Sequence, residues 1–177
     1  MKTIPASEYA LLGALMTGPR HGYQIRSFLR EELGTTWHIP TSQLYAQLRK
    51  LEEKGYVRSS VEPQESRPSR RVFELTPAGR EAFLDWAQAP AKHVRDLRVE
   101  FLAKLFFLHR LSMDGIGLIQ AQKRILEHTV ADMESRINSE DNAFRRLTAE
   151  FKHATAGAWL QWLVEKAQPF VKEIKSE

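Results

Sequence analysis

Residues Thr41 to Gly79 read TSQLYAQLRKLEEKGYVRSSVEPQESRPSRRVFELTPAG and carry the most informative pattern of the chain. The first part of this stretch carries three leucines at helical spacing, Leu44, Leu48 and Leu51, which fall on one face of a helix over 41–54. Thr41 or Ser42 is the expected N-cap of this helix, because short hydroxyl side chains satisfy the first free backbone N–H groups. The glycine at position 55 suits the end of the helix.

Two β-rich runs follow the helix, over 57–61 and 72–75, and two prolines keep the segment between them out of regular structure. Thr76 and Pro77 then combine a capping residue with the residue favoured at the first helical position. The expected order is therefore a helix, a β-hairpin and another helix.

The side of helix 41–54 opposite the leucines is polar and basic. The hairpin loop, SRPSRR at 66–71, adds three arginines and no acid. Hydroxyl groups, arginine and lysine suit phosphates, while arginine and glutamine can also read base edges. The residues expected to contact DNA are Ser42, Gln43, Tyr45, Ala46, Arg49, Lys50, Arg67, Arg70 and Arg71.

Two more helices are expected upstream. Ser7 is a candidate N-cap for the first, and the second is expected over 21–33, with Tyr23 among its inward residues and His21 packing against it or capping it. Three helices followed by a hairpin define a winged helix-turn-helix, with 41–54 as recognition helix and 57–75 as wing.

The second half is expected to be wholly helical, and the small proline-containing stretch at 88–91 separates it from the first. We therefore expect a mainly α protein with a winged helix-turn-helix domain over 1–90 and an all-helical, coiled-coil-like dimerisation domain over 91–177. Apolar residues surround the helix at 101–108, too many to pack against one neighbour.

A long helix is expected to start at Ser112 and to carry a 3-4 apolar repeat with Lys123 as its one polar interruption. Such a repeat predicts a coiled-coil-like seam, in which a lone polar residue can set register and partner number. The residues expected to form the dimer are Phe101, Leu105, Leu108, Ile119, Leu126 and Met133.

Composition sets further bounds. The chain has 177 residues, no cysteine and a formal net charge of +4. Residues 1–90 hold 12 Lys and Arg against 10 Asp and Glu, so any field that attracts DNA must be local. No run approaches a membrane span and no signal peptide is visible, so we expect a soluble cytoplasmic protein without membrane partners.

Signals for an enzyme are poor. Gly13 and Gly18 have P-loop spacing, but Pro19 and Arg20 stand where lysine and a hydroxyl residue are needed. The six histidines are scattered without metal-ligand spacing. We expect no catalysis, no metal and no cofactor.

The chain resembles the PadR family of bacterial transcriptional regulators. The resemblance lies in ALMTGPRHGYQI at 14–25, SQLYAQLRKLEEKGYV at 42–57 and RPSRRVFELTPAGR at 67–80, and it weakens after about Leu111. VEPQE at 61–65 and RVEFLAKL at 98–105 resemble the branch related to virulence activators. This resemblance implies Tyr45 near the DNA backbone, basic wing contacts and a helical C-terminal half that forms an antiparallel homodimer.

The resulting hypothesis is a dimeric, sequence-specific regulator that binds double-stranded DNA at a pseudo-palindromic operator. One alternative is a sensor of a phenolic or drug-like hydrophobic effector that controls DNA release, as relatives in the family imply. Its candidate ligand-binding aromatics are Trp37, Trp86, Phe106, Trp159 and Trp162, for which packing in the core is the competing interpretation. Another alternative is a winged-helix adaptor that contacts proteins.

Overall fold

The computed structural model describes residues 4–34, 39–63 and 69–173. The chain divides into two compact units, Met1–Ala87 and Gln88–Glu177. The sequence placed the boundary near residue 90. No helix in the described ranges combines the length and the apolar content that a membrane-spanning segment needs.

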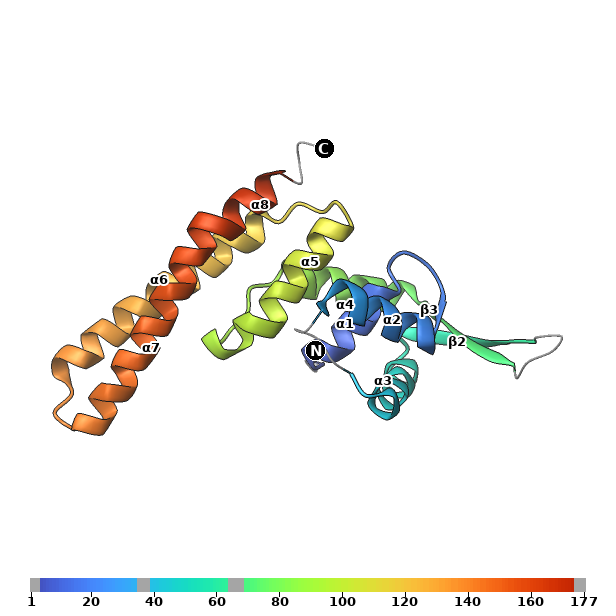
Figure 1. Cartoon of the computed structure of the whole chain (residues 1–177), viewed down its shortest axis with the longest axis horizontal. Helices are drawn as coiled ribbons and strands as arrows, with labels where there is room; N and C mark the ends of the chain where they lie inside the picture. Colours follow the sequence, from blue (N-terminus) through green and yellow to red (C-terminus); the bar gives the residue numbers. More distant parts are fainter. Residues whose placement is uncertain (1–3, 35–38, 64–68, 174–177) are drawn as a thin grey trace. The chain divides into compact units, whose positions relative to one another are not determined.

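The N-terminal unit is a winged helix-turn-helix, as predicted. Its elements are α1 (Ala6–Ala14), β1 (Arg20–His21), α2 (Gly22–Glu32), α3 (Thr41–Glu53), β2 (Val57–Glu62), β3 (Arg70–Leu75) and α4 (Pro77–Gln88). The three strands pair antiparallel in the order β1-β3-β2, and the β2–β3 hairpin projects beyond the helices of this unit (Figure 1). We call β2, β3 and their connection the wing.

Apolar residues from every layer of this unit meet in one core. Leu11 of α1, Ile25 of α2 and Leu48 of α3 are fully buried, as are Phe73 of β3 and Phe83 of α4. The predicted leucine face of α3 therefore points inward, and its polar face is left at the surface.

Two helix caps differ from the prediction. Ser7 and Thr41 lie inside the first turns of α1 and α3, and the N-cap positions are Pro5 and Pro40. Both prolines have φ −59° with an extended ψ, and their carbonyl oxygens accept the first helical hydrogen bonds, from Glu8 N at 2.9 Å and Leu44 N at 3.0 Å. Proline fixes φ near this value, so it presets the entry geometry without a side-chain cap.

The prediction that Tyr23 points inward is wrong, since 66% of it is exposed. Ile25, Phe28 and Leu29 form the buried side of α2, and Tyr23 falls on the opposite side, where it stacks on His21. His21 itself caps α2, because its Nδ1 accepts from Gln24 N at 3.3 Å while the Gln24 side chain accepts from His21 N. The short strand β1 was not predicted, because two residues carry no detectable periodicity.

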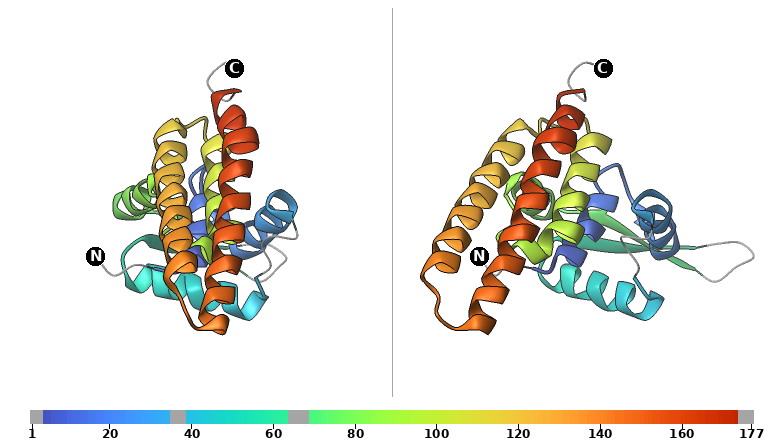
Figure 2. Two further views of the ribbon diagram at one scale, coloured as in Figure 1. Left: turned by 90° about the vertical axis from the view of Figure 1, so that its left-hand side faces the viewer. Right: turned by 60° about the vertical axis from the view of Figure 1, so that its left-hand side comes forward.

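The C-terminal unit is helical throughout its regular structure. A 3₁₀ turn (η2, Val94–Asp96) and a π turn (η3, Leu97–Phe101) lead into α5 (Leu102–Arg110). The long helices α6 (Ile116–Ser139) and α7 (Ala143–Trp162) form an antiparallel hairpin, and both views of Figure 2 show them side by side. A second π turn (η4, Leu163–Ala167) and α8 (Gln168–Glu173) complete the unit.

Helix α6 begins later than predicted, and its seam has a different polar residue. Ser112 has φ +50° in the turn before the helix, which starts at Ile116. Lys123 is not a buried interruption, because its side chain is 44% exposed and pairs with Glu127. Gln122 is buried instead, and it both accepts from and donates to the backbone of Ala91 at 2.7 and 3.2 Å.

The six residues predicted to form the dimer are core residues of the single chain. Their exposed fractions do not exceed 7% in any case: Phe101, Leu105, Leu108, Ile119, Leu126 and Met133. Phe101 lies in η3, Leu105 and Leu108 in α5, and the other three in α6; because all six are already buried within the chain, they are not available at the surface for a second copy. The sequence repeat could not distinguish a partner helix in the same chain from one in another.

Candidate nucleic-acid interface

The exposed face of α3 is polar and basic. The residues at its surface are Thr41, Ser42, Gln43, Tyr45, Ala46, Arg49 and Lys50, whereas Leu44, Gln47, Leu48 and Leu51 are buried. Within the described part of the chain, no carboxylate pairs with Arg49 or Lys50. This face therefore keeps its positive charge.

Polar contacts fix α3 to α1 behind this face. The amide of Gln47 donates to the hydroxyl of Ser7 at 2.9 Å. At the C-terminal end of the helix, Lys54 pairs at 2.7 Å with Glu8, whose side chain is only 5% exposed. Helix α3 is thus held to α1 at its middle and at its C-terminal end, and a fixed helix presents its side chains in a defined register.

A polar hollow of about 460 Å³ lies beside the first turns of α2 and α3. Its lining comes from β1, α2, α3 and β3, with one residue just before β3: His21, Gly22, Tyr23, Tyr45, Ser69, Arg70 and Arg71. A Cβ atom on Gly22 would lie 2.6 Å from the Tyr45 hydroxyl, so glycine lets Tyr45 lie against the start of α2. Free N–H groups and a partial positive charge at a helix N-terminus favour anions. Tyr23, Tyr45 and Arg70 are among the side chains that line the hollow at this helix start.

Arg71 is bound within the protein. Its guanidinium donates at 2.6 Å to Glu52 of α3 and at 2.7 Å to the hydroxyl of Ser59 on β2, and it lies over the ring of Phe73. The hydrogen bond from Ser59 to Glu52, together with Arg71, lowers the pKa of the Glu52 carboxyl below its ordinary value. This network joins the wing to the recognition helix, which sequence reasoning missed because Glu52 lies outside the loop.

The other described wing arginines differ in their pairing. Arg58 pairs with Glu74 at 3.0 Å, and the hydrogen bond from Arg58 lowers the pKa of the Glu74 carboxyl. Arg70 stands opposite Glu62 in the β2–β3 register, yet no ion pair joins them. Among the described wing residues, Arg70 is thus the arginine without a carboxylate partner, and Arg67 lies outside the described residues.

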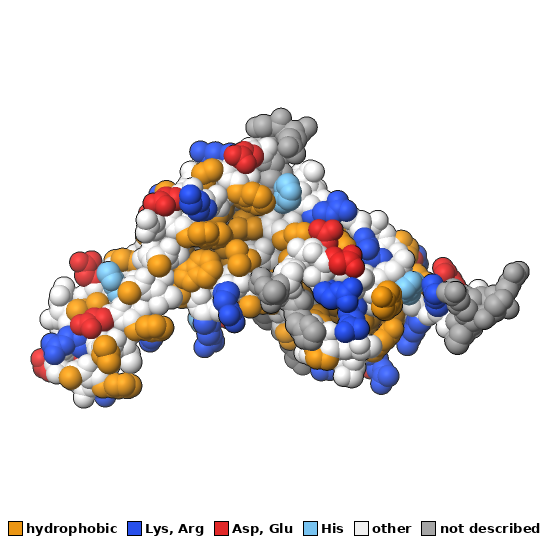
Figure 3. All heavy atoms as spheres, viewed as in Figure 1, with side chains coloured by type: hydrophobic (Ala, Val, Ile, Leu, Met, Phe, Trp, Pro, Cys, Tyr) orange, Lys and Arg blue, Asp and Glu red, His pale blue; other side chains and the backbone are white. Residues whose placement is uncertain are grey.

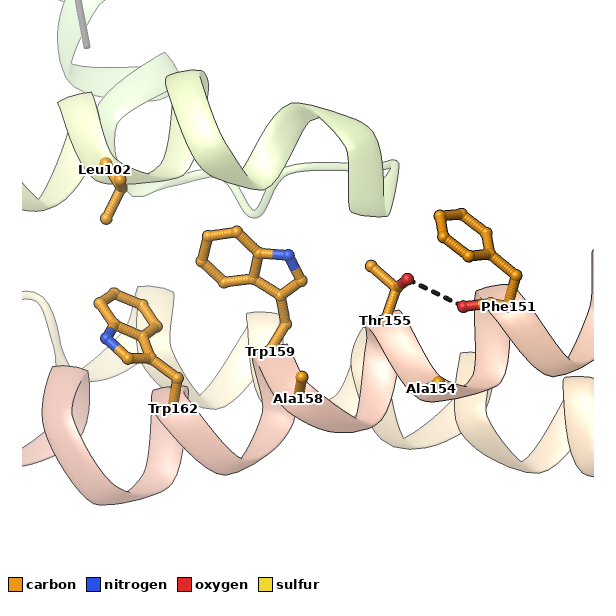
Figure 4. A pocket seen from close by; sticks show the side chains of 7 residues that line it. All are labelled: Leu102, Phe151, Ala154, Thr155, Ala158, Trp159 and Trp162. Carbon is orange, nitrogen blue, oxygen red and sulfur yellow. Dashed lines mark hydrogen bonds between the residues drawn. The ribbon is translucent and has the colours of Figure 1, made fainter. Parts of the chain in front are cut away.

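The predicted ligand-binding aromatics lie in different surroundings. Trp159 and Trp162 of α7 form one apolar wall opposite Leu102 of α5 (Figure 4). Trp86 belongs to the core of the N-terminal unit, where its ring stacks on Tyr9 at 5.0 Å. Phe106 packs edge-on against Phe107, and Trp37 lies outside the described residues. The described residues contain no cluster of three or more potential metal ligands.

Comparison with known proteins places this geometry in a family. Residues 11–85 match the family model described as the transcriptional regulator PadR-like family. The negative transcriptional regulator PadR of Bacillus subtilis is 32% identical over 128 residues, which cover 72% of this chain and 70% of that protein.

Two solved structures of Bacillus subtilis PadR are also similar. The complex with operator DNA covers 92% of this chain and 96% of that chain, with 24% identity and a TM-score of 0.47. The complex with p-coumaric acid covers 99% of each chain, with 22% identity and a TM-score of 0.40. Because the match to Bacillus subtilis PadR extends over 72% of this chain and the family model matches as well, the chain belongs to the PadR-like family of transcriptional regulators.

Proposed function

We propose that this protein is a dimeric, non-enzymatic regulator that binds double-stranded DNA with α3 in the major groove and the wing on the adjacent backbone. The observation that carries the proposal is the uncompensated positive charge of Arg49 and Lys50, next to a hollow formed by the α2 N-terminus, Tyr45 and Arg70. Such a regulator works on chromosomal DNA, so we place it in the cytoplasm of a bacterium.

Each exposed residue of the interface has a role that follows from its chemistry. Gln43 and Arg49 can form hydrogen bonds to base edges, because both side chains match donor and acceptor pairs in the major groove. Ser42, Tyr45 and Lys50 suit phosphates, and Ala46 gives the helix close access to the groove. Arg70 and Arg67 supply the wing contacts, whereas Arg71 positions the wing through Glu52.

An exposed apolar stripe on α7 supports the dimer. Phe144, Leu147 and Phe151 are 72%, 59% and 72% exposed and follow one another at helical spacing. Large apolar side chains gathered on one helix face mark interaction surfaces in soluble proteins. We assign the dimer contact to this stripe, in place of the six buried residues. Two-fold symmetry then requires half-sites about 10 bp apart or a multiple of that spacing.

Footprinting of genomic fragments by the purified protein tests the proposal. We expect protected sites with two-fold symmetry, and an observed binding constant that falls with salt. If a dimer neutralises roughly 6–8 phosphates, the slope of log K against log salt is about −5 to −7. Failure to retain any fragment at low salt would contradict DNA binding and favour the protein-interaction adaptor.

Sensing of a small molecule is the second candidate function. A groove of about 650 Å³ between α5 and α7 is lined almost entirely by apolar side chains, with Trp159 and Trp162 at its centre (Figure 4). Ligand sites are commonly concave, mostly apolar and aromatic.

A further inference from the structure

A cavity of about 590 Å³ lies between α6 and the segment that follows α4, and we call it the α6 cavity. It shares no lining residue with the apolar groove around Trp159 and Trp162. Its α6 residues recur at spacings of three and one, so they lie on one face of the helix. The lining consists of two residues of the preceding segment and five of α6: Pro90, Lys92, Ala121, Arg124, Ile125, His128 and Thr129.

The polar part of this lining is basic. Lys92 and Arg124 are exposed cations, and the exposed His128 adds an imidazole N–H donor. Within the described ranges none of the three forms an ion pair, and Glu127, which precedes His128, pairs instead with Lys123. Figure 3 shows that basic side chains of this unit gather along its lower edge, below an apolar middle. The α6 cavity therefore favours an anion.

The wall that carries Lys92 is held in place by two buried polar side chains. Gln122 of α6 is 1% exposed, and it accepts from Ala91 N at 2.7 Å and donates to Ala91 O at 3.2 Å. Lys104 of α5 is also 1% exposed, and its ammonium donates to Ala89 O at 2.7 Å. Burying such groups is costly unless they are hydrogen-bonded, and both here bind the backbone just before Lys92. This wall is thus preorganised beside α6, which lowers the entropic cost of binding a ligand.

We propose that the α6 cavity binds a phosphorylated small molecule, with the phosphate group held by Arg124, Lys92 and His128. Arginine binds phosphate through two parallel hydrogen bonds, and such charge-assisted bonds are the stronger ones. Arg124 and His128 lie one helical turn apart, so both can reach the same group. The three basic residues converge on one concave place, which suits a single phosphate group better than the extended backbone of a nucleic acid.

The size of the α6 cavity indicates an ester of phosphate. A volume of about 590 Å³ is much larger than a phosphate ion, and Pro90 and Ile125 line the remainder with apolar surface. An organic body attached to the phosphate would cover these side chains. The inference does not depend on DNA binding by the winged helix or on the apolar groove of the second candidate function.

Calorimetric titration of the full-length protein with glycerol 3-phosphate, inorganic phosphate and glycerol tests this assignment. We expect glycerol 3-phosphate to bind, inorganic phosphate to bind more weakly because it leaves the apolar wall uncovered, and glycerol not to bind. In the double variant Lys92→Gln with Arg124→Gln, the affinity for glycerol 3-phosphate should fall about 10-fold or more, as the loss of charge-assisted hydrogen bonds implies. The control Arg145→Gln with Lys166→Gln removes the same charge from exposed positions outside the lining and should behave like the wild type.

Several results would overturn the proposal. They are no binding of glycerol 3-phosphate at millimolar concentration, an unchanged affinity in the double variant, or an equal loss in the control. Equal affinities for inorganic phosphate and glycerol 3-phosphate would overturn the assignment to an ester and leave free phosphate as the ligand. A double variant that binds glycerol 3-phosphate normally but DNA weakly would show that the cavity contacts nucleic acid instead. DNA binding by the wild type, measured in parallel, separates these outcomes from failure of the DNA-binding proposal.

Discussion

Adjacent arginines of the wing have different environments. Arg71 is held by Glu52 and Ser59, while Arg70 borders the hollow at the α2 N-terminus without a carboxylate partner. From the sequence alone the two arginines are equivalent, since the loop contains no acid. The structure assigns the available charge to Arg70 and a structural role to Arg71.

We expect Arg70→Ala to weaken binding to all DNA sequences and to reduce the salt slope by up to about 2 per dimer, one contact per subunit. The reason is that a phosphate contact carries no sequence information. Binding measured over a range of salt concentrations checks this, with Arg146→Ala as the matched control. An unchanged slope in a folded Arg70→Ala variant would contradict the wing contact.

Arg49→Ala should change the preference of the protein among operator sequences. If Arg49 reads a base edge, its loss costs about 1–3 kcal/mol on the best operator and much less on operators altered at the contacted base pair. Competition among single-base operator variants measures this difference. A uniform loss across all variants would identify Arg49 as a backbone contact.

Gly79 allows the close packing of α4 on the turn between α3 and β2. A Cβ at this position would overlap the carbonyl oxygen of Tyr56, so Gly79→Ala should lower the free energy of unfolding by about 2–4 kcal/mol. Gly157 in α7 is the control, because its Cβ would meet no atom within 4 Å and alanine there should stabilise the helix by about 0.5–1 kcal/mol. Chemical denaturation of both variants tests the contrast, and equal stabilities would refute it.

At the scale of elements, the recognition helix is fastened on two sides. Gln47 and Lys54 tie it to α1, and Glu52 ties it to the wing through Arg71. These contacts link the two elements proposed to face DNA, so the spacing between α3 and β3 is fixed before DNA binds. Preorganisation of this kind lowers the entropic cost of binding.

The Glu52 network predicts a dependence of stability on pH. The pKa of Glu52 is lowered in the folded state, so its contribution is present above the unfolded pKa and is lost as pH falls through the folded one. Because the pair is partly exposed, Glu52→Gln should cost no more than about 0.5–1 kcal/mol at pH 7. This cost should shrink below about pH 4.5, where the carboxyl begins to protonate in the unfolded chain.

Thermal unfolding of wild type and Glu52→Gln between pH 3 and 7 measures this difference. The exposed neighbour Glu53, which forms no ion pair within the described ranges, gives the matched variant Glu53→Gln. A stability gap that stays constant across this pH range would show that the network adds nothing through its charge.

At the scale of the whole molecule, the proposed function depends on pairing of two chains. Only a dimer places two recognition helices on one pseudo-palindrome. The free energies of binding to the two half-sites then add. The exposed stripe on α7 is the surface that we assign to this pairing, because the apolar repeat of α6 is already used within the chain.

Leu147→Asp should therefore shift the protein toward monomers and weaken operator binding strongly, because it places a charge in an apolar contact. Ser135→Asp, at an exposed position on α6, introduces the same charge outside the stripe and should leave the dimer intact. Sedimentation of both variants at the same concentrations distinguishes them. A dimeric Leu147→Asp variant would move the interface elsewhere.

Local sequence patterns were sufficient to predict the helices and the hairpin of the N-terminal unit and the exposed face of α3. Leucine spacing, the glycine at 55 and the Thr76–Pro77 start are local signals, and local signals survive in the folded state. The sequence also predicted a helical second half. It could not show that Pro5 and Pro40 occupy the N-cap positions in place of hydroxyl residues, because this depends on the backbone path into each helix. It could not show that Arg20 and His21 form a strand, because this strand exists only by pairing with β3.

Residues of the same type differ in their partners and burial, and these differences become visible only in the folded chain. Folding paired Arg71 with Glu52, 19 positions away, and left Arg70 without such a partner. It buried the α6 repeat against α7 and left Phe144 and Leu147 at the surface, and it brought Lys92, Arg124 and His128 to one cavity. Charge pairing, burial and cavity shape depend on neighbours in space, whereas periodicity along a chain specifies only which face of an element a residue occupies.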